Sequence, residues 1–70
     1  MIPLRFADVG TACIIKKIGG SPEVKKHLEN LGFSVGGSVT LINTTGGNVI
    51  VKVKEARVAL DALMANKIMI

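Results

Sequence analysis

Chemically reactive side chains are scarce in this sequence of 70 residues. It has one histidine, His27, one cysteine, Cys13, and five carboxylates that lie apart from one another along the chain. No CxxC, HExxH, paired-aspartate or P-loop motif occurs. Enzymes that hydrolyse bonds, use metals or transfer phosphate need several convergent polar groups. The sequence therefore predicts a protein that is not an enzyme, with no catalytic residues, no cofactor and no metal site.

Only one arrangement has a spacing that suits metal ligands. Glu23 and His27 are four residues apart in a stretch that is expected to be helical. Structural metal sites normally use four ligands, whereas an isolated pair at this spacing is more often a contact on the helix surface. We interpret the pair as a surface contact.

Aromatic side chains are nearly absent, with two phenylalanines and neither tyrosine nor tryptophan. Proteins that bind single-stranded nucleic acid usually stack bases on aromatic rings. The net charge of +4 would suit a polyanion, but the nine basic residues occur in ones and twos. We therefore predict no nucleic-acid partner. A small basic β-barrel that binds RNA or DNA is kept as an alternative.

Features of secreted and membrane-spanning chains are also missing. A single cysteine cannot form an internal disulfide, and the opening residues MIPLRFADVG contain no apolar run of signal-peptide length. The uncharged stretch 30–51 is about as long as a membrane span of roughly 20 residues, but five glycines interrupt it. These observations predict a cytoplasmic protein.

What the sequence does have is a high apolar content, 49% of residues. A chain of this length buries only about 60% of its unfolded surface, so its core must be densely apolar. We expect one domain that covers residues 1–70.

The stretch from Ser21 to Gly37 predicts one short helix that is followed by a strand. Ser21 can cap the first turn, and Pro22 suits the first helical position. Gly32 supplies the left-handed residue that commonly ends a helix, and Phe33 can fold back on the last turn. The apolar residues of the helix share one stripe at helical spacing: Val24, Leu28 and Leu31.

Most of the remaining sequence predicts short strands. We expect strands over 11–18, 38–44, 49–53 and 68–70, with a tight hairpin at Thr45–Asn48 because Gly and Asn tolerate positive φ. The inward face of 11–18 is ambiguous, and a bend or bulge would partly bury both sets of side chains. Residues 1–10 form an extended lead-in, with Leu4 or Phe6 closing one end of the core. Together these elements predict a mostly β fold with one or two short helices, arranged as a small β-barrel.

The segment 58–65, VALDALMA, consists mainly of good helix formers. We expect one or two helical turns around residues 60–65, and Asn66 can close that helix. Residues 55–57 are expected to form the preceding turn.

Three segments carry a resemblance to a known family. They are PLRFADVGTACIIKKI near the start, HLENLGFSVGGSV in the middle and ARVALDALMANKIMI at the end. In this order and spacing they resemble the ferrous iron transport protein A (FeoA) family over essentially the whole chain. One departure is the run Lys25-Lys26-His27, where many relatives have arginines.

The resemblance implies an SH3-like barrel of about five strands, with the helix Pro22–Leu31 packed on it. It also implies a cytosolic accessory role in ferrous iron uptake. The implied partner is FeoB, a membrane transporter with a cytoplasmic G domain, so that the protein would reach the membrane only through this partner. A metal-responsive regulatory domain is a second alternative, because a related fold occurs in metal-dependent repressors.

We therefore expect a protein-interaction module. The exposed face of the helix and the turn that follows it are the best candidate surface. The predicted partner-binding residues are Lys25, Lys26, Phe33 and Arg57, with Leu28 and Leu31 supporting them from the core side. Exposed barrel edges also leave a weak homo-oligomer open.

Overall fold

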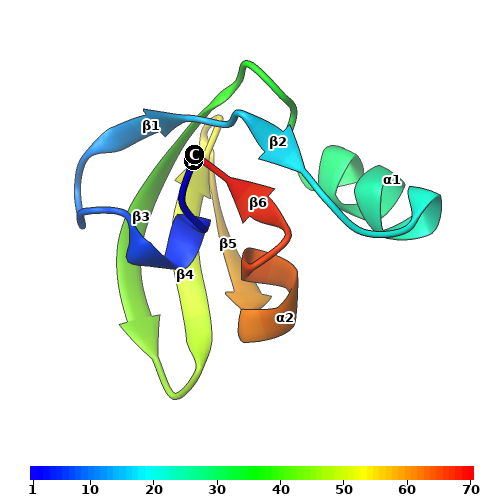
Figure 1. Ribbon diagram of the computed structural model, residues 1–70. Coiled ribbons are helices and arrows are strands. Elements are labelled where there is room, and N and C mark those ends of the chain that lie inside the picture. Colours follow the sequence, from blue (N-terminus) through cyan, green and yellow to red (C-terminus); the bar gives the residue numbers. More distant parts are fainter.

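The computed structural model describes all residues, 1–70. It contains a four-stranded antiparallel sheet in the order β1-β3-β4-β5 and a two-stranded sheet of β2 and β6 (Figure 1). The elements are η1 (Leu4–Phe6), β1 (Ala12–Ile14), β2 (Lys17–Ile18), α1 (Pro22–Asn30), β3 (Ser38–Thr45), β4 (Asn48–Val53), β5 (Ala56–Asp61), α2 (Ala62–Ala65) and β6 (Ile68–Met69). The predicted fold class is confirmed as a small SH3-like fold that is mostly β, although the two sheets do not close into one continuous barrel.

The hairpin of β3 and β4 is the centre of the larger sheet. Its turn uses Gly46 and Gly47 at positive φ, 55° and 85°, which is the backbone that such turns require. Val49, Val51 and Val53 alternate along β4 and are all buried. The predicted hairpin and the predicted inward face of β4 are both confirmed.

The expected single strand over 11–18 is divided into β1 and β2, and the bend that the ambiguous inward face predicted lies between them. The Ile15 N–H donates to the Gly37 carbonyl, and the next N–H, that of Lys16, donates to the Met69 carbonyl. The chain thus changes its partner from the β3 side to β6 and turns a corner between the sheets. Ile15 and Ile18 point into the core, whereas the Ile14 side chain is 54% exposed.

Of the helical turns predicted around 60–65, the structure confirms 62–65 as α2, whereas residues 60 and 61 belong to a strand. Residues 56–61 form the edge strand β5, which pairs with β4 from Val53↔Ala56 to Asn48↔Asp61. Pairing places Leu60 opposite Val49 in the core, and this burial outweighs the helix propensity of the segment. Within this segment only α2 is helical. Asp61 caps its first turn, because the Asp61 Oδ1 accepts a hydrogen bond from the Met64 N–H at 2.8 Å. Asn66 closes α2 as predicted.

The N-terminal residues are not simply extended, since 4–6 form the 3-10 helix η1. Leu4 is fully buried and is the residue that plugs the core, whereas Phe6 is 59% exposed. The alternative in which Phe6 closes the core is therefore wrong.

Helix α1 begins and ends where the sequence predicts. The Ser21 Oγ accepts from the Val24 N–H at 3.3 Å. At the other end Gly32 has φ of 109°, the Phe33 N–H donates to the Leu28 carbonyl at 3.0 Å and the Gly32 N–H to the Glu29 carbonyl at 2.9 Å. This bonding pattern is a Schellman motif. It ends the helix sharply and directs Phe33 into the core.

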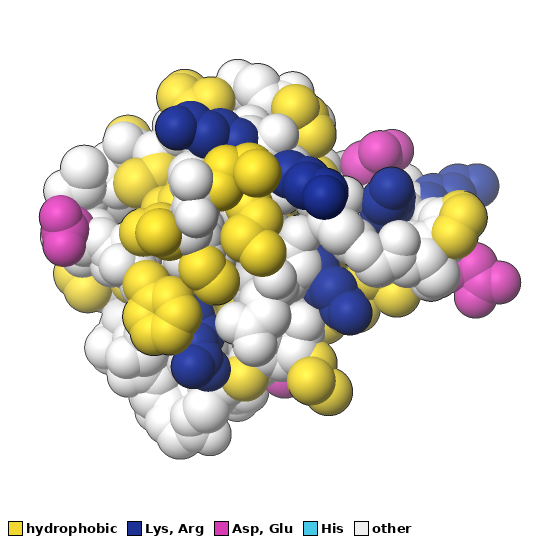
Figure 2. Space-filling view, viewed as in Figure 1, with side chains coloured by type: hydrophobic (Ala, Val, Ile, Leu, Met, Phe, Trp, Pro, Cys, Tyr) yellow, Lys and Arg dark blue, Asp and Glu magenta, His cyan; other side chains and the backbone are white.

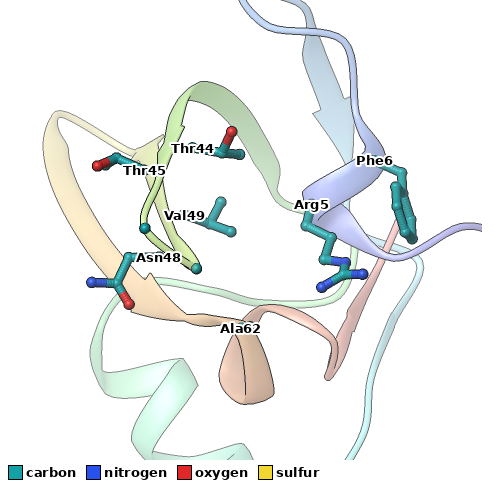
Figure 3. A pocket seen from close by; sticks show the side chains of 9 residues that line it. Arg5, Phe6, Thr44, Thr45, Asn48, Val49 and Ala62 are labelled. Atoms are coloured by element: carbon teal, nitrogen blue, oxygen red, sulfur yellow. The ribbon is translucent and has the colours of Figure 1, made fainter.

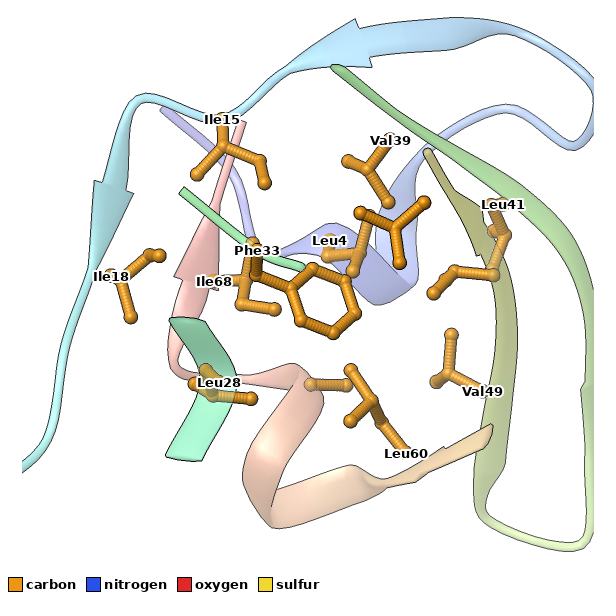
Figure 4. Packing of buried hydrophobic residues seen from close by; sticks show 13 residues of the cluster. Leu4, Ile15, Ile18, Leu28, Phe33, Val39, Leu41, Val49, Leu60 and Ile68 are labelled. Atoms are coloured by element: carbon orange, nitrogen blue, oxygen red, sulfur yellow. The ribbon is translucent and has the colours of Figure 1, made fainter. Parts of the chain in front are cut away.

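Thirteen hydrophobic residues form one buried cluster between the sheets and the helices, and no polar residue is buried. Figure 4 shows the Phe33 ring among side chains from η1, α1, β6 and the large sheet. Leu28 comes from α1 and is also fully buried, so the helix is held against the core at its last turn.

Candidate partner-binding surfaces

Helix α1 presents two of the predicted partner-binding residues to solvent. Lys25 and Lys26 are both exposed. Leu28 is fully buried, and the half-buried Leu31 packs against the core, as the apolar stripe predicted. The helix therefore has a fixed inner face and a charged outer face.

Phe33 does not belong to this surface. Its side chain is 0% exposed and lies in the core (Figure 4), so it cannot touch a partner while the protein is folded. The prediction that Phe33 faces a partner is wrong. The same Schellman motif that ends α1 turns the ring inward, and this ring packs with Leu28.

Arg57 is exposed on β5, in a different environment from the α1 lysines. Register places it beside Lys52, which lies opposite Thr40 on β3. These neighbours belong to the outer face of the large sheet. A shallow cleft of about 280 Å³ opens on this face, and it is lined only by polar residues: Ser38, Thr40, Lys52 and Lys54.

A second cleft, of about 250 Å³, lies between η1, the tip of the β3–β4 hairpin and the start of α2 (Figure 3). Arg5 and Phe6 form one wall, and the Arg5 guanidinium carbon lies 4.8 Å from the centroid of the Phe6 ring. This distance allows a cation–π contact. Thr44, Thr45 and Asn48 supply polar groups on the hairpin side, and no carboxylate lines the cleft. Sequence analysis missed it because its walls come from segments far apart in the chain.

No group of three or more His, Cys, Asp or Glu side chains is placed to hold a metal ion. Glu23 and His27 are both exposed on α1. The Cys13 Sγ lies 3.5 Å from the Thr11 carbonyl oxygen and is half-buried. None of the helices has both the length and the apolar character that a membrane crossing requires.

Comparison with known proteins places this architecture in a family. Residues 2–70 match the family described as "FeoA domain". Over 70 residues the chain is 33% identical to the protein named "Putative Fe(2+) transport protein A" of Methanocaldococcus jannaschii, covering all of this chain and 85% of that protein. A crystal structure described as an iron uptake regulatory protein (FeoA) superposes with a TM-score of 0.86, at 20% identity, over 96% of this chain and 91% of that one. A small β fold with a docked helix is thus shared, and the chain belongs to the FeoA family.

Proposed function

We propose that this protein is an accessory component of ferrous iron uptake that acts by binding the cytoplasmic part of a FeoB-type transporter. The observation that carries the proposal is the family match over residues 2–70. The name of the M. jannaschii relative, a Fe(2+) transport protein, supports the link to iron. In this proposal iron is the cargo of the transporter, and the present chain contributes a docking surface in the cytoplasm.

Helix α1 is the surface that we assign to the transporter. A rigid interaction element loses little conformational entropy on binding. The cap at Ser21, the Schellman motif at Gly32 and the buried Leu28 side chain all fix α1 in place. Its exposed lysines, Lys25 and Lys26, suit an acidic patch on the partner, because complementary charge raises the association rate and sets specificity.

Arg57 is proposed as a secondary contact. It lies on the outer face of β5 beside Lys52, so a partner that reaches it would have to extend from α1 onto the large sheet. Contacts at such a rim usually change the association rate more than the affinity.

An NMR titration of the labelled protein with the cytoplasmic domain of the transporter from the same genome tests the proposal. We expect the largest chemical-shift changes at 22–31, with smaller ones near Arg57. Shifts confined to the hairpin tip at 45–48 would move the binding surface to the cleft beside Phe6. An absence of any shift at high protein concentration would contradict the proposal.

A further inference from the structure

The N- and C-terminal segments lie side by side, so that the N-terminal segment is a second neighbour of β6 beside β2. Ile2 and Ile70 exchange two backbone hydrogen bonds, at 3.0 and 2.9 Å, and Pro3 bridges to Met69. On its other side β6 pairs with β2, with Lys17 opposite Met69. The N-terminal segment thus lies along β6 on the side opposite β2, and the bonds between Ile2 and Ile70 hold the two termini together.

The outer surface of this ribbon combines apolar residues with one lysine. Register places Pro3, Met69 and Lys17 on the same outward side, because Ile68 and Ile18, which alternate with them, are buried. Met1 is 74% exposed, and Ile2 is 47% exposed. In Figure 2 the hydrophobic side chains gather over the region where Figure 1 shows both termini and β6.

Cations border the apolar area. Arg5 stacks on the exposed Phe6 ring, and Lys16 and Lys17 are exposed at the start of β2. Figure 2 shows Lys and Arg side chains beside the central hydrophobic area, whereas the visible Asp and Glu side chains lie farther out. We call this surface the terminal face: the apolar Met1, Phe6 and Met69 with the cations Arg5, Lys16 and Lys17.

We propose that the terminal face binds the surface of an anionic lipid membrane. A lipid surface requires an apolar centre that enters the headgroup region and cations that meet the lipid phosphates. Long Lys and Arg side chains can keep their charges at the headgroups while their stems cover apolar surface.

The proposal goes beyond transporter binding and uses different residues. The transporter surface is assigned to the outer face of α1, which Figure 1 shows at the side of the molecule, away from the termini. A protein that lies on the membrane by its terminal face would keep Lys25 and Lys26 free for a cytoplasmic domain beside it. Vesicle binding would also concentrate the protein near its partner, because both would share one surface.

A tryptophan probe gives the direct test, since the natural sequence has no tryptophan. The variant Phe6→Trp places the indole on the terminal face. The control variant Ala59→Trp places it on the outer side of β5. Each protein is mixed with vesicles of phosphatidylcholine alone or of equal parts phosphatidylcholine and phosphatidylglycerol. We expect a blue shift of the emission only for Phe6→Trp with the anionic vesicles, and the shift should be lost in high salt.

Two charge-matched variants test the role of the cations. Each lysine near an anionic surface contributes about 1 kcal/mol, so K16E/K17E should weaken vesicle partitioning by at least about thirtyfold. K25E/K26E has the same net charge and should change partitioning by less than about threefold, because its charges lie on α1.

Three results would overturn the lipid proposal: no blue shift, equal shifts for both probes, or equal losses for both lysine pairs. Binding only to vesicles that contain the transporter would assign the terminal face to a protein. The transporter proposal is tested separately, because binding to the cytoplasmic domain is measured in the absence of lipid.

Discussion

Replacement of Phe33 tests whether this residue belongs to the core or to the binding surface. The ring is 0% exposed and is packed among other buried side chains (Figure 4). Removal of a buried phenylalanine side chain costs about 3–5 kcal/mol. A domain of this length has a free energy of unfolding of roughly 4–10 kcal/mol at 0.05–0.15 kcal/mol per residue. Phe33→Ala should therefore populate the unfolded state strongly.

Phe33→Leu is the more informative variant, because it keeps an apolar side chain of similar size. We expect a loss of about 1–1.5 kcal/mol in the free energy of unfolding and a fall in Tm of roughly 4–12 °C. Urea unfolding followed by circular dichroism measures the first quantity, and a thermal scan measures the second. Affinity for the transporter domain should stay unchanged below the melting transition.

The opposite pattern would refute the burial of Phe33. If the ring faced a partner, Phe33→Leu would leave the unfolding free energy unchanged and weaken binding. Val35→Ala provides a control, because Val35 follows closely in the chain but is 65% exposed. Its substitution should change stability by less than about 0.5 kcal/mol.

Further substitutions at three places in the chain test the local structure. Gly32→Ala should cost about 1–2 kcal/mol, because alanine is strained at the φ of 109° although the nearest atoms leave room for its Cβ, and urea unfolding would show the loss. Ser21→Ala should cost about 1 kcal/mol through loss of the α1 cap, again by urea unfolding, and Ser21→Asp should restore the stability. Ile15→Ala should cost about 2–4 kcal/mol, whereas Ile14→Ala should cost less than about 0.5 kcal/mol; equal losses would place the corner between β1 and β2 elsewhere.

Structural elements that are determined by a few neighbouring residues could be predicted well from the sequence. The cap at Ser21, the left-handed Gly32 and the Gly46-Gly47 turn each depend on a few adjacent residues, and all three are confirmed. Val49 to Val53 has strict alternation and forms a buried strand face. In these places the residue type alone restricts the backbone.

Elements that depend on distant partners could not be predicted. The segment 58–61 has helix-forming residues, but its pairing with β4 makes it a strand. The ambiguous inward face of 11–18 indicated a bend, but the division into two strands follows from a change of partner between β3 and β6, which the sequence does not specify. Long-range pairing decided both cases.

The candidate sites divide in the same way. Exposure of Lys25 and Lys26 follows from helical periodicity and is found in the structure, whereas the cleft beside Phe6 is assembled from three distant segments. For Phe33 the sequence did contain the answer. Its predicted role as the latch of α1 already required it to fold against Leu28, and hence to be buried.

The affinity of two charge-reversal variants for the cytoplasmic domain of the transporter tests the central proposal most directly. Isothermal titration calorimetry without lipid would compare K25E/K26E with K16E/K17E, which carry the same net charge. If α1 binds the transporter, K25E/K26E should weaken binding by at least about tenfold, through like-charge repulsion at the interface, and K16E/K17E should stay within about threefold of the natural protein. Equal affinities for the two variants, or a larger loss in K16E/K17E, would contradict the assignment of α1 as the transporter-binding surface.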